Sequence, residues 1–366
     1  MDQLSDNIYA VILAGGSGTR FWPKSRHKSP KQLCKIGNDK QSMLEITLAR
    51  LDDFIPPERR LIVTHCDQIE DTKKIAGDHC SWYLSEPEAR NTANALTLAA
   101  LEVNARHKDN TPAIMVSLHA DHVIKDIEAF RKSISDGVKV AQDDKLTLLG
   151  IVPEYAETGY GYIEKGEQLK KLPGHLVKSF REKPDRNTAE AYIKSNNFLW
   201  NAGIFIWKTD VLLNEIKDKL PPAFTKLKGL LEEQQLDSFA SVPFSKLAET
   251  YGELAKISID NAILETSKEV AVVDADIGWQ DVGSWDAIAK CFETDTDGNL
   301  LYGDVISIDN QNLTVDTDGP MIACIGLKDL VVVSAKGAVL VCPPDRAQDV
   351  RKVVEKLKEA NRHEYL

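Results

Sequence analysis

Three glycines directly after the first apolar run could form a loop that binds phosphate. Gly15, Gly16 and Gly18 follow that run, and Arg20 and Lys31 come soon afterwards. Glycines let backbone N–H groups wrap an anion closely, and cations complete such a nest. A tight turn without a ligand is the alternative, but it would leave the two cations unexplained. We therefore expect a phosphate-binding loop.

Two better-known glycine loops do not fit this segment. A P-loop needs a Gly-Lys pair, which is missing. A dinucleotide fingerprint needs a third glycine where Phe21 stands, and an acid at the end of the second strand where His65 stands. Lys24, Arg26 and Lys28 extend the basic cluster, and we interpret them as an exposed, solvated loop.

Further polar residues stand at the ends of predicted elements. Asp121 ends a strand, at the edge where ligands gather in open α/β sheets. His119 and His122 flank it and raise a transition-metal alternative, but the sequence offers no third nitrogen or sulfur ligand. Asn91 or Thr92 begins a helix, where free N–H groups suit polar ligand atoms. Simple helix capping is the alternative there.

The composition narrows the class of protein. With 366 residues, 43% of them hydrophobic, the chain can bury the core of one large domain and a smaller one. A net charge of -11 without an extended basic tract argues against nucleic acid as a partner. The six cysteines have no paired spacing, the N-terminus is acidic, and no apolar run approaches the ~20 residues of a membrane span. We expect reduced cysteines, a cytoplasmic location and no membrane association.

Strand-like and helix-like segments alternate along the first half of the chain. This order predicts a doubly wound, mostly parallel sheet with helices on both faces, an α/β fold of the Rossmann-like type. The alternating segments are residues 9–15, 42–54, 59–65, 91–107, 112–124, 127–142 and 146–152.

A polar, turn-rich stretch at 293–304 separates two parts of the chain. We predict a catalytic domain at 1–292 and a small β-rich C-terminal domain at 293–366 that ends in a helix. The short β-like runs after the boundary are too few for an independent core. They should pack on the catalytic domain or on a second copy of the chain, which favours a homodimer.

Seven motifs in register closely resemble the sugar-1-phosphate nucleotidyltransferases, over about residues 8 to 290. The Trp-Pro and Pro-Lys-Gln form of the first motif is similar to that of the mannose-1-phosphate guanylyltransferase branch. Two positions depart from the family pattern, since His119 stands where proline is usual and Ala202 where serine is usual. The motifs are LAGGSGTRFWP with SPKQL, EPEARNTANA, ADHVI, TGYGYIE, FREKPD, WNAGIF and WQDVGSWDAI.

The resemblance implies a nucleotidyltransferase fold and a reaction. An oxygen of mannose 1-phosphate would attack the α-phosphorus of GTP, and pyrophosphate would leave. Arg20 would contact the pyrophosphate, and Lys31 the α-phosphate and the sugar phosphate. Asp121 and Asp281 would hold Mg²⁺, with Mn²⁺ as a substitute, because hard cations prefer carboxylates.

The resemblance also implies the binding residues. We expect four tryptophans, Trp200, Trp207, Trp279 and Trp285, in the core or the pocket wall. The nucleotide-binding residues would be Leu13, Ala14, Gly15, Gly16, Ser17, Gly18, Thr19, Glu86, Arg90, Asn91 and Thr92. The sugar-binding residues would be Gly161, Glu182, Lys183, Asn201 and Asp281. The basis of guanine selection does not follow from the sequence.

Two alternatives use the same fold. One is transfer from UTP or dTTP, or to glucose 1-phosphate. The other is a non-catalytic regulatory homologue that binds sugar nucleotides. Such a homologue should have lost Arg20, Lys31 or an aspartate, and all of these residues are present.

Overall fold

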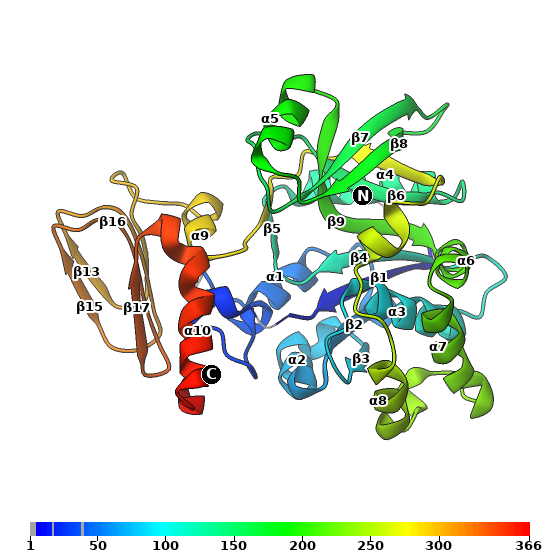
Figure 1. Cartoon of the computed structure of the whole chain (residues 1–366), viewed down its shortest axis with the longest axis horizontal. Coiled ribbons are helices and arrows are strands. Elements are labelled where there is room, and N and C mark those ends of the chain that lie inside the picture. Colours follow the sequence, from blue (N-terminus) through cyan, green and yellow to red (C-terminus); the bar gives the residue numbers. More distant parts are fainter. Residues whose placement is uncertain (1–4, 17, 38–39) are drawn as a thin grey trace.

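A nine-stranded mixed sheet forms the body of the protein (Figure 1). The computed structural model describes residues 5–16, 18–37 and 40–366. In spatial order the strands are β3 (Trp82–Glu86), β2 (Arg60–His65), β1 (Ile8–Ala14), β4 (Ile114–His119), β9 (Phe198–Lys208), β6 (Leu146–Ile151), β10 (Val270–Asp274), β8 (His175–Glu182) and β7 (Gly161–Gln168).

The prediction of a mostly parallel sheet is correct only for part of it. Strands β3, β2, β1 and β4 are parallel, as are β6 and β10. β9 runs antiparallel to β4, β6 and β7, and β7 pairs antiparallel with β8. Because β9 meets β7 as well as β6, the far strands curl back and close on themselves. Antiparallel neighbours need no helical crossover, so the simple alternation of strand and helix ends after β6.

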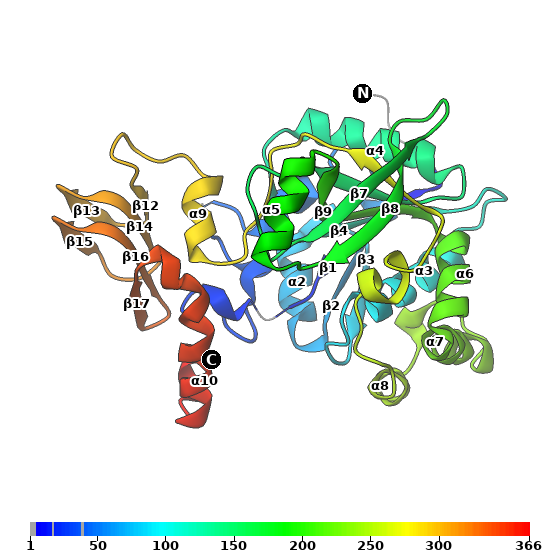
Figure 2. The same ribbon diagram turned by 45° about the horizontal axis from the view of Figure 1, so that its top comes forward.

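Two helical layers cover the two faces of this sheet, as Figure 2 shows from a second angle. Alternate side chains of β1 point to opposite faces, so that Val11 packs beside α3 and Ile12 beside α1 and α4. One layer consists of α3 (Thr92–Arg106), α6 (Thr209–Lys219), α7 (Pro221–Glu233) and α8 (Phe244–Gly252). The other contains α1 (Met43–Ala49), α2 (Ile69–Ala76), α4 (Ile127–Ala141) and α5 (Arg186–Ser195).

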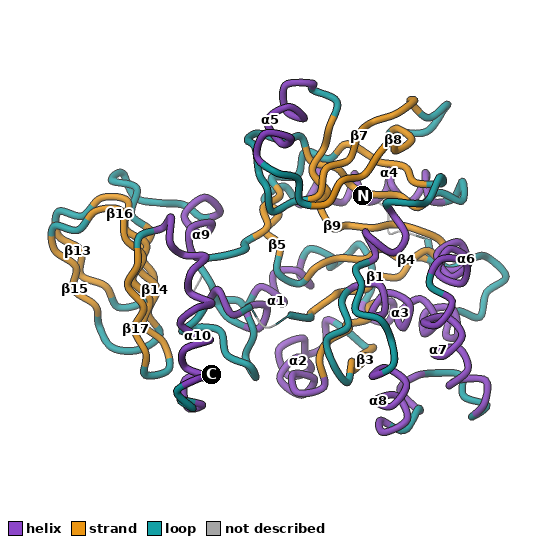
Figure 3. Tube along the Cα trace, viewed as in Figure 1, coloured by secondary structure: helices purple, strands orange, loops and turns teal. Residues whose placement is uncertain are grey.

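Short, mostly parallel strands form the C-terminal unit, which is well separated from the main sheet in Figure 3. One sheet contains β12 (Leu300–Tyr302), β14 (Gln311–Thr317), β16 (Lys328–Ala335) and β17 (Ala338–Cys342). The other pairs β13 (Val305–Ile308) with β15 (Ile322–Ile325). The helices α9 (Trp285–Cys291) and α10 (Val350–Glu359) lie between this unit and the body (Figure 1).

An apolar cluster joins the C-terminal unit to the loop that follows the glycines. Phe21, Trp22 and Trp285 pack there with Val333 and Val350. The unit therefore shares an apolar cluster with the body of the protein. The exact boundary between the two domains stays a prediction.

The same contact overturns part of our interpretation of the basic loop. Lys24 is only 7% exposed and forms an ion pair with Asp316 of β14. Arg26 is also buried and lies 5.6 Å from the centre of the Trp22 ring. Only Lys28 of these three cations is exposed as expected. The C-terminal unit covers the loop, and no local sequence pattern reveals that cover.

Two other expectations concern the cysteines and the membrane. All six cysteines are free, and Cys34, Cys80, Cys291 and Cys324 are buried. Within residues 5–16, 18–37 and 40–366, no helix combines the length and apolar character needed to cross a bilayer.

Candidate active site

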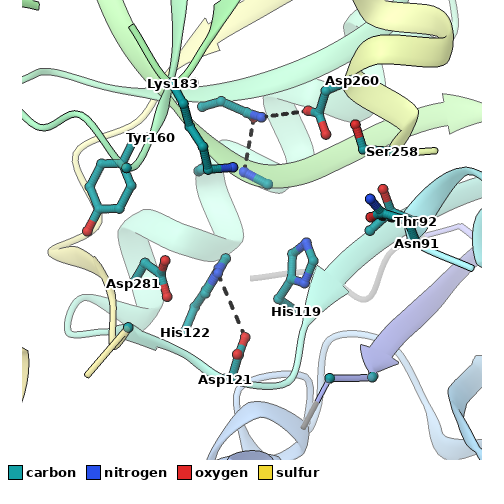
Figure 4. A pocket seen from close by; sticks show the side chains of 18 of the residues that line it. Asn91, Thr92, His119, Asp121, His122, Tyr160, Lys183, Ser258, Asp260 and Asp281 are labelled. Atoms are coloured by element: carbon teal, nitrogen blue, oxygen red, sulfur yellow. Dashed lines mark hydrogen bonds and ion pairs between the residues drawn. The ribbon is translucent and has the colours of Figure 1, made fainter. Parts of the chain in front are cut away.

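A cavity of about 700 Å³ opens where the glycine loop faces the β7–β9 side of the sheet (Figure 4). It brings together residues from both sets predicted from the sequence. On the nucleotide side these are Gly15, Gly16, Gly18, Thr19, Arg20, Asn91 and Thr92, and on the sugar side Gly161, Glu182, Lys183 and Asn201. Lys31, Asp121 and Asp281 lie in the same cavity.

A second cavity of about 310 Å³ adjoins the first and shares Gly15, Gly16, Asn91 and Thr92 with it. Leu13, Glu86 and Arg90 line this one, so these predicted nucleotide residues lie together in the adjoining cavity. Ala14 lines neither cavity, and its carbonyl accepts hydrogen bonds from Gln32 and Thr64. Ser17 lies outside the described residues.

Helix capping and cavity lining coincide at the start of α3. Asn91 is the N-cap, and its side chain accepts a hydrogen bond from the Thr92 N–H at 2.8 Å. The Thr92 hydroxyl accepts one from the Ile259 N–H at 2.9 Å. Both side chains therefore have structural roles, and both still face the cavity. Their predicted contact with a nucleotide stays a prediction.

Lys31 joins the two aspartates at the centre of the cavity. Its Nζ lies 2.8 Å from Asp121 Oδ2 and 4.0 Å from Asp281 Oδ1, and it donates to the Val282 carbonyl at 2.5 Å. The Lys31 side chain is buried, so water screens its attraction to the two carboxylates only weakly. Gly18 is close by with φ 54, and a Cβ there would lie 2.6 Å from Lys31 Cβ. Only glycine leaves Lys31 this room.

The surroundings of Asp121 keep its carboxylate ionised. Burial raises the pKa of Asp121, but Lys31 and the neighbouring imidazoles outweigh burial and hold it well below its usual range. Burial and the proximity of His119 lower the pKa of His122 to about 4. His122 is therefore a neutral imidazole near pH 7. The indole N–H of Trp279 donates to its Nδ1 at 3.2 Å, so its Nε2 carries the proton that faces Asp121.

Polar side chains on the opposite wall form hydrogen bonds with one another and with the backbone. Asn201 Nδ2 donates to Asp260 Oδ1 at 3.0 Å, and Asn201 Oδ1 accepts from the Gly203 N–H at the same distance. Burial and the charge of Glu182 raise the pKa of Asp260 to about 6. A Cβ at Gly161 would lie 2.6 Å from Glu182 Oε2, so glycine lets this carboxylate reach the cavity.

Comparison with known proteins decides the family. Residues 9–298 match the Nucleotidyl transferase family model, and residues 295–357 match the MannoseP isomerase/GMP-like beta-helix domain. The chain belongs to the nucleotidyl transferase family.

The relatives of this nucleotidyl transferase include named enzymes. Mannose-1-phosphate guanylyltransferase 2 of Escherichia coli O157:H7 is 36% identical over 98% of this chain and 75% of its own length. Mannose-1-phosphate guanylyltransferase of Escherichia coli strain K12 is also 36% identical, with the same coverage. A crystal structure described as mannose-1-phosphate geranyltransferase from Thermus thermophilus has a TM-score of 0.85 at 33% identity, covering 96% of this chain and 99% of that one.

The donor atoms of the nucleotidyl transferase fit a hard divalent cation. Asp121 and Asp281 present carboxylate oxygens to one cavity, and hard cations prefer such ligands. Ligand atoms of His119, Asp121 and His122 also lie within 4.8 Å of one another, and this spacing is compatible with a transition-metal site. The Trp279 hydrogen bond opposes it, because the free nitrogen of His122 then carries a proton. Among the described residues no third nitrogen or sulfur joins this group.

Several cavity residues of the nucleotidyl transferase escape prediction from sequence. Tyr160 stands edge-on between the rings of Trp200 and Trp279, at 5.3 and 5.1 Å. The four expected tryptophans are all buried, and Trp279 also lines the cavity. Asp260 belongs to a π-helical turn (Asp260–Leu264). Gln32, Ser258 and Asn261 also line the cavity without having been predicted.

Proposed function

We propose that this nucleotidyl transferase moves GMP from GTP to α-D-mannose 1-phosphate, giving GDP-mannose and pyrophosphate. One observation carries the proposal. Lys31 and two carboxylates lie between a glycine loop and a wall of polar side chains that can form hydrogen bonds with hydroxyl groups. A donor triphosphate and an acceptor sugar phosphate would meet there.

The nucleotide occupies the glycine-loop side of the cavity. Backbone N–H groups around Gly15 and Gly16 wrap the triphosphate, and the Arg20 guanidinium neutralises the leaving pyrophosphate. Transfer at phosphorus needs little covalent help from the protein, so positioning and charge neutralisation provide most of the catalysis. The sugar phosphate attacks the α-phosphorus from the side opposite the pyrophosphate.

Lys31, Asp121 and Asp281 act where the two phosphates approach each other. We propose that the two carboxylates hold Mg²⁺, which when bound supplies positive charge to the reacting phosphates. Lys31 keeps both carboxylates close together while that charge is absent. Mn²⁺, which also accepts oxygen ligands, is the proposed substitute.

Glu86 provides a basis for selecting guanine. It lies at the buried end of β3 in the smaller cavity, and the Tyr251 hydroxyl donates to its Oε1 at 2.7 Å. Guanine presents N–H donors at N1 and at its 2-amino group, and a carboxylate accepts both. Uracil and thymine present one ring N–H and no amino group, so they leave part of this carboxylate unpaired.

The mannose ring occupies the opposite wall. Asn201 and Glu182 offer fixed donors and acceptors for its hydroxyls, with Asp260 behind Asn201. Lys183 forms an ion pair with Glu182, which limits the movement of both side chains. This wall supports the predicted sugar contacts of Gly161, Glu182, Lys183 and Asn201.

Homodimerisation is part of the same proposal. Ile308 and Ile325 are register partners on β13 and β15, and these residues are 47% and 66% exposed. A second copy of the chain packed on this strip would remove them from water. Light scattering of the protein and of an Ile308→Lys variant tests this, since a dimer through the strip should become a monomer.

A substrate panel tests the proposed reaction. GTP, ATP, UTP and dTTP are each assayed with mannose 1-phosphate and with glucose 1-phosphate. We expect the highest kcat/KM for GTP with mannose 1-phosphate. A preference of about tenfold or more for UTP or dTTP, about 1.4 kcal/mol, would contradict the proposal.

A further inference from the structure

A residue of the C-terminal unit holds Arg20. The Arg20 Nη1 donates to Gln348 Oε1 at 3.0 Å. Gln348 belongs to the 3₁₀ turn Pro344–Asp349, which leads into α10. Arg20 and Gln348 are 328 positions apart in the sequence, so only the docking of the C-terminal unit brings them together.

The other end of the Gln348 amide is fixed as well. Its Nε2 donates to the Ser284 hydroxyl at 2.7 Å, and Ser284 in turn donates to Asp286. Ser284 is 2% exposed and comes soon after Asp281 in the sequence. A glutamine suits this place because its amide donates at one atom and accepts at another.

The bond leaves most of the Arg20 guanidinium free. A guanidinium has five N–H donors, and Gln348 takes one of them. In the part of the chain that the structure describes, Gln348 is the one hydrogen-bond partner of Arg20. The same Nη1 would lie 3.5 Å from a Cβ at Gly283, so the group rests against the rim of the cavity.

Holding an exposed arginine matters for catalysis. A free Arg side chain samples many rotamers, and ordering it during the reaction costs free energy. A guanidinium already fixed toward the leaving group avoids that cost and is better aligned in the transition state. Packing of Trp22 and Phe21 against Val350 keeps the Gln348 turn beside the glycine loop.

We propose that Gln348 is a positioning residue that holds the Arg20 guanidinium toward the leaving pyrophosphate. The C-terminal unit thus completes the nucleotide side of the active site. This inference rests on the proposed nucleotidyl transfer, in which Arg20 meets the pyrophosphate. It does not depend on the base or the sugar, because every nucleoside triphosphate releases the same pyrophosphate.

The variant Gln348→Ala tests the inference, with whichever substrate pair the panel identifies. We expect about a tenfold loss in kcat and about a tenfold weaker binding of pyrophosphate by calorimetry, as for one hydrogen bond to a charged group. The KM for the sugar phosphate and the melting temperature should not change. Arg346→Ala is the matched control, since this exposed residue of the same turn pairs only with Asp349 among the described residues.

A double-variant cycle separates positioning from a general structural role. In an Arg20→Ala background, Gln348→Ala should cause no further loss of pyrophosphate binding, because the group that it positions is gone. Additive losses would overturn the inference, as would unchanged pyrophosphate binding in Gln348→Ala alone. If instead no substrate pair is turned over by the parent protein, the proposed function fails, and pyrophosphate binding still tests the Gln348 contact.

Discussion

Asp281 lies directly opposite His122 in an antiparallel pair of short strands. These strands, β5 (His122–Ile124) and β11 (Trp279–Asp281), form a two-stranded ribbon beside the main sheet. Asp121 immediately precedes β5, so the ribbon brings together two carboxylates that are far apart in the sequence. A shift of this register would separate them, so the ribbon sets the geometry of the proposed metal site.

The metal proposal predicts a shared requirement for both carboxylates. Asp121→Asn and Asp281→Asn should each need far more Mg²⁺ or Mn²⁺ for half-maximal activity. Each should also lower kcat by on the order of a hundredfold, because the lost charge acts mainly in the transition state. GTP should still bind, since the glycine loop is unchanged. Titration of metal against activity, with GTP binding measured separately, checks both parts.

Asp276→Asn is the matched control for these variants. Asp276 is exposed and lies outside the cavity, just before β11. Its replacement should leave the metal requirement and the rate as they are. If Asp281→Asn behaved like this control, Asp281 would be reduced to a contact for a sugar hydroxyl.

The close approach of Gly18 to Lys31 predicts that Gly18→Ala damages both stability and activity. Alanine in a left-handed backbone conformation costs about 1 to 2 kcal/mol. The new Cβ would also lie 2.6 Å from the Cβ of Lys31 and 2.8 Å from the backbone N of Lys31. Relief of that overlap would move Lys31 away from Asp121. Gly326→Ala provides the control, because it has φ 65 but nothing within 4 Å of the new Cβ. Gly326→Ala should lower the melting temperature, because of the strained backbone, and keep full activity.

Because the ion pair between Lys24 and Asp316 is buried, removing one partner alone should destabilise the fold more than removing both. Burial raises the pKa of Asp316 despite the attraction of Lys24, so ionised Asp316 is tolerated only with its partner. Lys24→Met should lower the free energy of unfolding by about 3 to 5 kcal/mol, because it leaves a buried charge unpaired. Adding Asp316→Leu should restore most of that loss. Lys28→Met, at an exposed position, should change stability little.

Those variants are compared by urea unfolding. If the double variant were as unstable as Lys24→Met, the unpaired charge of Asp316 would not be the cause of the lost stability.

Local patterns account for the elements and the motifs that sequence predicts. Strand β1 is a continuous apolar run, and α3 begins at an Asn cap, so both follow from neighbouring residues. β9 does not, because its direction depends on β4, β6 and β7, which lie elsewhere in the chain. The predicted site residues that line the cavity belong to contiguous motifs.

Long-range contacts account for what the sequence hides. The sequence predicts that Lys24 is exposed, but in the folded protein it pairs with Asp316, a residue 292 positions away. Gln348 stands in an unremarkable turn, and nothing near it indicates that it reaches Arg20. Asp260 has no motif that links it to Asn201, which it meets only across the cavity wall. Pairings of this kind depend on how distant segments of the chain pack against one another.

Burial of Glu86 predicts a pH dependence of stability. Burial raises its pKa to about 7, only partly opposed by the Tyr251 hydroxyl, whereas an unfolded glutamate titrates near its ordinary value of 4.5. Between these values the folded protein binds more protons than the unfolded one. The free energy of unfolding should therefore fall as pH rises from about 4.5 to about 7, and level off above. Glu86→Gln should remove that part of the fall, whereas Glu70→Gln, on the surface of α2, should not.

The same carboxylate predicts how the protein distinguishes purine nucleotides. Ionised Glu86 would accept hydrogen bonds from N1 and the 2-amino group of guanine, so GTP affinity should rise between about pH 6 and pH 8. Inosine triphosphate lacks the 2-amino group and should bind about tenfold less tightly, because one acceptor site is left unpaired. In Glu86→Gln both the pH dependence and the preference for GTP over inosine triphosphate should be lost. Binding of the two nucleotides, measured by calorimetry across that pH range, checks this. If the variant kept the preference, the contacts that select guanine would lie elsewhere in the smaller cavity.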